Sequence, residues 1–189
     1  MCRRRRLASL SVVVVLAVLA ATQPLEADGV SAPALTAAFL YNFAKFAEWP
    51  ADALAPKQRL SLCVVGDDAV ADALEQTIKG RTVEGHELSV GILKSSGPFT
   101  SCHLLYIGGR DTKRSLQALE ALKGTSVFAV GEADGFAESG GIAQLILEND
   151  KMRFAINIAA AQRARLQLSS KLLSLATIIN EKEAGNVRR

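Results

Sequence analysis

The sequence predicts a single three-layer α/β domain, Rossmann-like, in which helices flank a mixed, mostly parallel sheet. Short apolar runs rich in β-branched residues alternate with segments of helical periodicity, which is typical of a parallel sheet covered on both faces. About 160 residues remain behind an N-terminal export segment, a length that suits one domain with its own core. Two late strands are separated by a short connection, which adds an antiparallel hairpin to the sheet.

Residues 1–27 have the features of a cleavable signal peptide. Arg3–Arg6 precede an almost uninterrupted apolar run, Leu7–Ala21, and small residues follow it. The run is about 15 residues long, below the roughly 20 that a membrane-spanning helix needs, and an uncleaved anchor is the alternative. Cys2 stands in the charged leader and not behind the apolar run, so no lipid anchor is expected. We expect an exported protein in an oxidising compartment outside the cytoplasm, with its domain over residues 28–182 and a flexible tail over 183–189.

The positive charge of the chain belongs to this leader. The full sequence has 22 basic and 19 acidic side chains, and residues 1–27 contain four arginines and one glutamate, which leaves 18 of each sign. Nucleic-acid binding depends on clustered lysine and arginine, so nucleic acid is excluded as a partner.

Cleavage also removes one of the three cysteines and leaves Cys63 and Cys102. An even pair of cysteines in an oxidising compartment predicts a disulfide. Closing a loop of roughly 40 residues would stabilise the fold by about 3–4 kcal/mol. Two separate buried thiols are the alternative.

The first helix is expected from Pro33 to the stop at Trp49-Pro50. Pro33 suits a first helical turn, and a stripe of mainly apolar residues recurs at steps of three and four. The stripe consists of Leu35, Ala38, Phe39, Asn42, Phe43 and Phe46. A strand over 60–65 then ends at Gly66-Asp67-Asp68 and leads into a helix with apolar residues between Val70 and Ile78.

The remaining elements follow the same alternation. Strands are expected over 88–93, 104–107 and 126–130, with a helix over 112–122 that Gly124 closes. A turn or short helix around 136–141 precedes strands over 142–147 and 153–158, which form the antiparallel hairpin. Leucines at helical spacing predict a last helix over 168–179.

The sequence contains no recognisable catalytic constellation. The first strand-to-helix turn lacks the closely spaced glycines of a dinucleotide site, and His86 and His103 have no metal-ligand spacing. Neither a P-loop nor a nucleophile elbow occurs. The sequence therefore favours a binding protein over an enzyme, with no cofactor and no metal.

Two sets of residues are candidates for binding. Tyr41, Lys45, Glu48 and Trp49 fall largely off the apolar stripe of the first helix, and tyrosine and tryptophan are favoured in protein interfaces. We expect them to bind a protein partner; the alternative for Trp49 is that it covers the core. The second set, Asp67 and Arg110, follows predicted strands, where α/β proteins bind ligands. A helix N-cap is the alternative role of Asp67, and a solvated turn that of Arg110-Asp111.

Several motifs resemble the YfiR family. The run from Ala37 to Pro50, AAFLYNFAKFAEWP, resembles the opening signature of that family. Further along the chain, the resemblance includes Cys63–Asp67, Cys102–Ile107, Val130-Gly131-Glu132 with Gly135-Phe136, Gly140–Ala143, Arg153–Asn157 and Leu168–Leu173. These motifs occur in the family's order and extend over residues 34–180.

The resemblance implies a periplasmic protein that represses an inner-membrane diguanylate cyclase by binding its periplasmic region, which lowers cyclic di-GMP and biofilm formation. Cys63 and Cys102 match the family's central cysteine pair, and the family's cysteines are linked to redox control. A second pair found in some members is absent, which puts in doubt a switch that depends on two bridges. A periplasmic small-ligand sensor without a cyclase partner is the alternative function. The sequence also leaves the oligomeric state undecided, and a homodimer is one alternative because an aromatic helix can pack on its symmetry mate.

Overall fold

The computed structural model of the protein describes residues 31–94, 97–149 and 151–179. The predicted signal peptide, residues 1–27, and the predicted tail, residues 183–189, lie outside the described residues. The chain divides into the units Met1–Val30 and Ser31–Arg189, and the description below concerns the second. Among the helices of that described part, none has the length and apolar character needed to cross a membrane.

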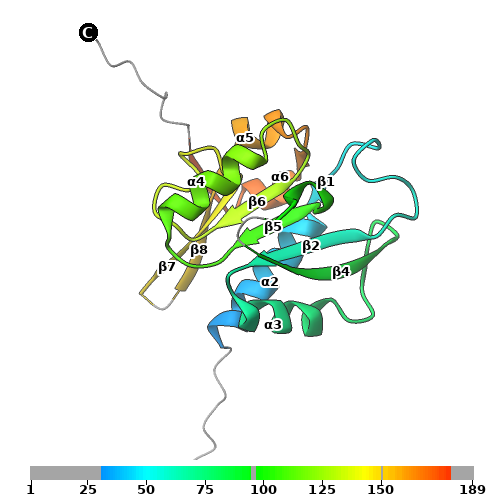
Figure 1. Cartoon of the computed structure of the whole chain (residues 1–189), viewed down its shortest axis with the longest axis horizontal. Helices are drawn as coiled ribbons and strands as arrows, with labels where there is room; N and C mark the ends of the chain where they lie inside the picture. Colours follow the sequence, from blue (N-terminus) through cyan, green and yellow to red (C-terminus); the bar gives the residue numbers. More distant parts are fainter. Residues whose placement is uncertain (1–30, 95–96, 150, 180–189) are drawn as a thin grey trace, which may run out of the picture. The chain divides into compact units, whose positions relative to one another are not determined.

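A mixed sheet of eight strands organises the domain (Figure 1). Its strand order is β10-β8-β7-β6-β5-β2-β4-β3. The strands are β2 (Leu60–Val65), β3 (Thr82–Val83), β4 (His86–Leu93), β5 (Leu104–Ile107), β6 (Phe128–Gly131), β7 (Ala143–Glu148), β8 (Lys151–Asn157) and β10 (Thr177–Ile179). Five of the seven neighbouring pairs are parallel. This confirms the predicted α/β class with a mixed, mostly parallel sheet, and the antiparallel β7-β8 pair confirms the predicted hairpin.

Helices cover both faces of this sheet. The helices α2 (Ala32–Lys45) and α3 (Asp68–Ile78) pack on one face, where Leu62 and Val64 of β2 point. The helix α4 (Thr112–Ala121) and the short helix η1 (Phe99–Ser101) pack on the other face, with Cys63 and Val65. Alternate residues of β2 therefore serve two separate hydrophobic clusters, which explains why the whole strand is apolar.

An aromatic cluster fixes α2 on the sheet. Ser31 caps the helix by accepting a hydrogen bond from the backbone N–H of Ala34. The fully buried Phe43 stacks on Phe128, with 5.6 Å between ring centroids, and meets Phe154 edge-on at 5.2 Å. Such pairs add to the stability that burial of the rings provides.

The predicted first helix extends too far toward Trp49. The helix ends at Lys45, and β1 (Ala47–Glu48) follows directly. This strand pairs antiparallel with β9 (Gln167–Leu168), as a small second sheet. Phe46 fits the helical spacing because it is the C-cap residue of α2, and the helix makes no further turn after it.

The predicted helix over 168–179 is wrong. After β9, Ser169 is the N-cap of the short helix α6 (Ser170–Leu173), and its hydroxyl accepts a hydrogen bond from the backbone N–H of Leu172. The chain then enters β10, where the β-branched residues 177–179 pair parallel with residues 155–157 of β8. Leu175 is 71% exposed, so the leucine spacing does not mark a buried helix face. Strand pairing overrides the helical pattern here.

Sequence reasoning also missed α5 (Ile158–Arg163), which directly follows β8. Asn157 is its N-cap and is fully buried. The predicted strand over 153–158 therefore extends one residue into this helix.

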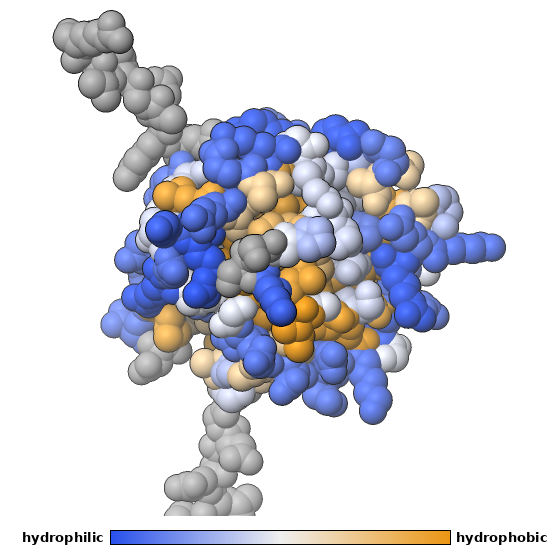
Figure 2. Space-filling model, in the orientation of Figure 1, coloured by the Kyte–Doolittle hydropathy of each residue, from blue (hydrophilic) through white to orange (hydrophobic). Residues whose placement is uncertain are grey.

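The surface carries few large exposed apolar side chains. In the view of Figure 2, hydrophobic residues gather in the middle of the face and hydrophilic ones surround them. The large apolar residues that are strongly exposed lie on different elements of the described chain; they are Ile92, Leu116, Leu147, Leu175 and Ile178. They do not mark one helix or strand as an interface.

Candidate functional site

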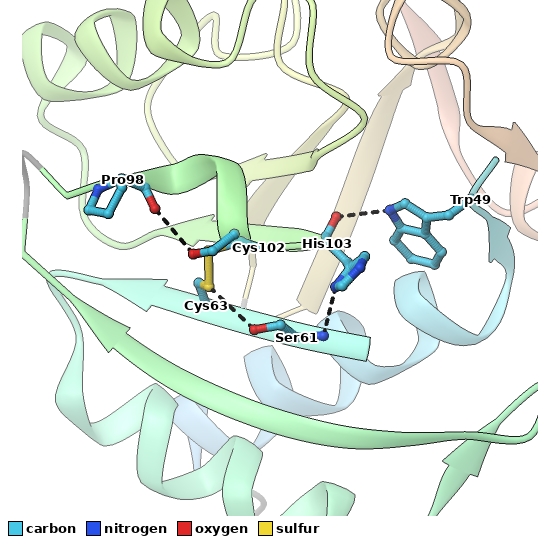
Figure 3. The surroundings of a disulfide bond; sticks show 7 residues. Trp49, Ser61, Cys63, Pro98, Cys102 and His103 are labelled. Carbon is cyan, nitrogen blue, oxygen red and sulfur yellow. Dashed lines mark hydrogen bonds between the residues drawn. A yellow bond between two sulfur atoms is a disulfide. The ribbon is translucent and has the colours of Figure 1, made fainter. Parts of the chain in front are cut away.

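The disulfide between Cys63 and Cys102 belongs to one of the two hydrophobic clusters and lies beside the polar residues Ser61 and His103 (Figure 3). Cys63 lies in β2, and Cys102 lies just before β5, the strand beside β2. Their Cα atoms are 5.8 Å apart, and each residue is only 3% exposed. The predicted pairing is confirmed: two cysteines that are 39 positions apart form the bridge, and Cys102 reaches Cys63 from the segment that precedes β5 and not from the β2-β5 ladder itself, in which Cys63 is paired with Leu105.

His103, next to the bridge, connects the sheet to the loop after β1. Its Nδ1 accepts a hydrogen bond from the backbone N–H of Ser61 at 2.9 Å, and its Nε2 lies 3.1 Å from the carbonyl oxygen of Ala53. A ring that accepts at Nδ1 and donates at Nε2 is neutral. Burial lowers the pKa of His103, which the hydrogen bond to Ala53 partly opposes and the charge of His86 reinforces.

The side chain of Trp49 contacts this histidine in two ways. Its indole Nε1 donates to the carbonyl oxygen of His103 at 3.1 Å, and the two rings meet edge-on with 6.3 Å between centroids. Figure 3 shows the indole beside the histidine and the disulfide on the other side of it. The half-buried Trp49 therefore covers part of the core and still reaches the surface. Sequence reasoning considered His103 as a metal ligand and set it aside, and nothing in its neighbours indicates these contacts with residues more than 40 positions away.

The other predicted partner residues lie near the end of α2 and on β1. Tyr41 is half-buried and has the guanidinium of Arg81 5.0 Å from its ring centroid. Lys45 is exposed, and its Nζ lies 5.7 Å from the ring of Phe46. Glu48 is exposed on β1. All four predicted residues, Tyr41, Lys45, Glu48 and Trp49, are thus at least partly accessible, and partner binding stays a prediction.

A small pocket of about 220 Å³ opens beside Trp49. Buried aliphatic residues form part of it, namely Ala47, Leu60 and Val83. The polar residues that line it are Glu48, Glu84 and His86. Glu84 and His86 come from the β3-β4 hairpin, so the pocket combines segments that are almost 40 residues apart. Sequence reasoning did not identify this pocket.

The carboxyl ends of the central strands hold a second polar group. Asp67 caps α3 by accepting from the backbone N–H of Val70 at 3.0 Å, as the alternative reading of that residue expected. The Tyr106 hydroxyl donates to Glu132 at 2.6 Å, and burial is the main cause that raises the pKa of Tyr106. Arg110 is exposed. Ligand binding by Asp67 and Arg110 stays a prediction.

A larger cavity of about 660 Å³ lies between α4 and α5. Aliphatic side chains dominate its lining, among them Leu119, Leu122, Val127 and Ile142. None of the binding residues predicted from the sequence lines it. Within the described part of the chain, no group of three or more His, Cys, Asp or Glu side chains could hold a metal ion.

Comparison with known proteins connects this architecture to a family. The family model described as YfiR/HmsC-like matches residues 33–177. Among solved structures, the crystal structure of a conserved domain protein from Vibrio cholerae O1 biovar El Tor str. N16961 is similar, with a TM-score of 0.50 and 16% identity. The match covers 79% of this chain and 60% of that one, and at this identity it shows the fold alone. Comparison with curated proteins found no match. Because the family model spans nearly all of the described domain, the chain belongs to the YfiR/HmsC-like family.

Proposed function

We propose that this protein is a periplasmic repressor of an inner-membrane diguanylate cyclase. It binds the extracytoplasmic part of the cyclase and holds it inactive, which lowers cyclic di-GMP and biofilm formation. Membership in the YfiR/HmsC-like family carries the proposal, because that family is regulatory and acts with a membrane partner. The buried disulfide supports an exported protein, since such bridges persist in oxidising compartments.

The proposed contact surface consists of Tyr41, Lys45, Glu48 and Trp49. These residues lie on α2, on β1 and directly after β1. Tyrosine and tryptophan contribute strongly to interfaces when a rigid scaffold presents them, and Trp49 is held by its hydrogen bond to His103. The two exposed charges, on Lys45 and Glu48, provide orientation and specificity more than affinity.

Repression requires that the protein bind the inactive cyclase more tightly than the active one. Shifting a two-state enzyme from 1:99 to 99:1 takes about 10⁴-fold differential affinity, about 5.5 kcal/mol. A few well-packed aromatic contacts that form only with the inactive cyclase are sufficient for this, because single interface anchors contribute about 2 kcal/mol or more.

The test measures intracellular cyclic di-GMP in the host with and without the gene. Deletion should raise the level, and the wild-type gene should restore it. The variants Lys45→Glu and Glu48→Lys should fail to restore it. The matched control is Lys113→Glu, which reverses an exposed charge on α4, on the opposite face of the sheet. A level that deletion leaves unchanged would refute cyclase repression, and equal behaviour of all three variants would refute the contact surface.

A small-ligand sensor is the second candidate. The exposed Arg110, at the carboxyl end of β5, has no ion-pair partner among the described residues, and it could receive an anionic ligand. Inorganic phosphate at millimolar concentration should then raise the melting temperature of the wild type and not that of Arg110→Ala. An equal response of the two proteins would remove this candidate.

A further inference from the structure

We infer that the pocket beside Trp49 receives one basic side chain, lysine or arginine, from the membrane partner. The inference rests on the proposed function, and it adds the chemistry of the contact. It extends the surface predicted from the sequence to Glu84 and His86, which no sequence motif identified.

The size of the pocket indicates a single side chain. Its volume is about 220 Å³, whereas pockets for drug-sized ligands measure about 300–1,000 Å³. Three of its four aliphatic residues, Ala47, Leu60 and Val83, are at most 5% exposed, so they form a floor rather than a rim. An aliphatic stem that ends in a polar group matches such a floor.

The charges around the floor determine the sign of that polar group. Glu48 and Glu84 both line the pocket and are exposed, and neither forms an ion pair with any described residue. Arg59 and Glu87, which adjoin the lining residues Leu60 and His86 in the sequence, form an ion pair with each other at 3.1 Å. An anionic side chain would meet two uncompensated carboxylates, whereas a cation would be paired. The indole of Trp49 adds the ring that cations prefer.

The histidine of the pocket is also arranged as an acceptor. The Nδ1 of His86 lies 2.7 Å from the carbonyl oxygen of Gln58, which can only accept, so Nδ1 carries the proton. In the neutral ring, Nε2 then has a free lone pair. When this ring is neutral, His86 and the two glutamates therefore all offer acceptors to the pocket, which suits the several N–H donors of an ammonium or a guanidinium.

The backbone conformation of Glu84 indicates that its carboxylate has a function in the pocket. Glu84 and Gly85 form the two-residue turn between β3 and β4, with φ values of +47° and +82°. Such turns favour Asn, Asp or Gly at the first position, because the left-handed region disfavours longer side chains. A glutamate at this position is unfavourable for folding and places a carboxylate at the pocket.

Trp49 makes the inference directly measurable, because it is the only tryptophan of the chain. Its indole N–H gives one NMR resonance, and titration with N-acetyl-arginine amide should shift it in a saturable manner. N-acetyl-citrulline amide has nearly the same shape without the charge, and it should bind at least tenfold more weakly. The double variant Glu48→Gln/Glu84→Gln should lose this preference, while Glu120→Gln on α4 should keep it. An indole resonance that both probes shift equally, or that neither shifts, would overturn the inference.

A second experiment distinguishes failure of the pocket inference from failure of the proposed function. The double variant should fail to restore cyclic di-GMP in the deletion strain, although its melting temperature stays near that of the wild type. If it binds no arginine probe but restores repression fully, the partner does not use the pocket and the inference is wrong. If deletion of the gene leaves cyclic di-GMP unchanged, the proposed function fails, whereas the titration still decides whether the pocket selects a cation.

Discussion

Reduction of the Cys63–Cys102 bridge should destabilise the domain without changing its native fold. The ladder between β2 and β5 pairs residues 62–65 with 104–107, and these hydrogen bonds hold the two strands together whether or not the sulfurs are bonded. The bridge therefore acts mainly on the unfolded chain, where it closes a loop between positions that are 39 residues apart.

The expected size of the effect follows from that loop. In the chain-entropy model, a loop of this length corresponds to about 4 kcal/mol. For a domain of this size, a loss of 4 kcal/mol lowers the melting temperature by about 8–16 °C. Replacing both cysteines by alanine should cost more than reduction, because both residues are 3% exposed and the sulfur atoms pack within the cluster that includes Val65 and Phe99.

The assay compares urea unfolding of three proteins: the oxidised wild type, the wild type refolded in reductant, and Cys63→Ala/Cys102→Ala. The reduced wild type isolates the crosslink, since it keeps both sulfur atoms. Far-ultraviolet circular dichroism before unfolding checks that the native fold persists. If the oxidised and reduced proteins unfold at the same urea concentration, the crosslink does not restrict the unfolded chain and the reasoning is wrong.

Three further predictions concern stability and use the same urea assay. Phe43→Ala should cost about 3–5 kcal/mol, because its fully buried ring contacts Phe128 and Phe154; a loss below 1 kcal/mol would contradict this packing. Asn157→Ala should cost about 2–4 kcal/mol, since its buried amide donates to the carbonyl oxygen of Ala137 at 2.7 Å and also caps α5. His103 has a lowered pKa in the folded state, so its neutral form contributes stability that is present above pH 6.5 and is lost as pH falls through the folded pKa; His103→Gln should flatten this part of the pH profile.

Local signals were sufficient for the central part of the fold. The strands β2 and β5 have the predicted bounds, because each is a short apolar run that a glycine or a turn ends. The helices α3 and α4 begin where Asp67 and Asp111 can cap them, a signal that is contained within four residues of sequence. Elements that local chemistry starts and stops could be predicted from the sequence.

Elements that depend on distant partners could not be predicted. The segment over 168–179 has leucines at helical spacing, yet β10 forms there because β8 offers a free edge for parallel pairing. Likewise, β1 exists only because β9, about 120 residues later, pairs with it. No window of local sequence contains this information, since both partners of each pair are needed to satisfy the backbone groups.

The candidate site, like the fold, could be predicted only where the local sequence determines it. Glu48 and Trp49 stand out in the sequence because they fall off the apolar stripe of the predicted first helix, whereas Glu84 and His86 reach the same pocket only through the β3-β4 hairpin. The contact that orients Trp49 is a backbone carbonyl, that of His103, and a backbone group has no signature in the sequence. Sequence reasoning therefore identified Glu48 and Trp49 in the lining of the pocket but missed Glu84 and His86.

The sequence left two roles open for Trp49, core cover or interface anchor, and the structure makes them compatible. Burying an indole without a partner for its N–H would be unfavourable, and the His103 carbonyl removes that cost. The same hydrogen bond, together with the edge-on contact between the two rings, limits the rotamers of the side chain before any partner arrives. A side chain that is already ordered loses less conformational entropy on binding, typically about 0.5–1.5 kcal/mol per side chain. The contact that stabilises the domain thus also prepares the surface on which the proposed partner would bind.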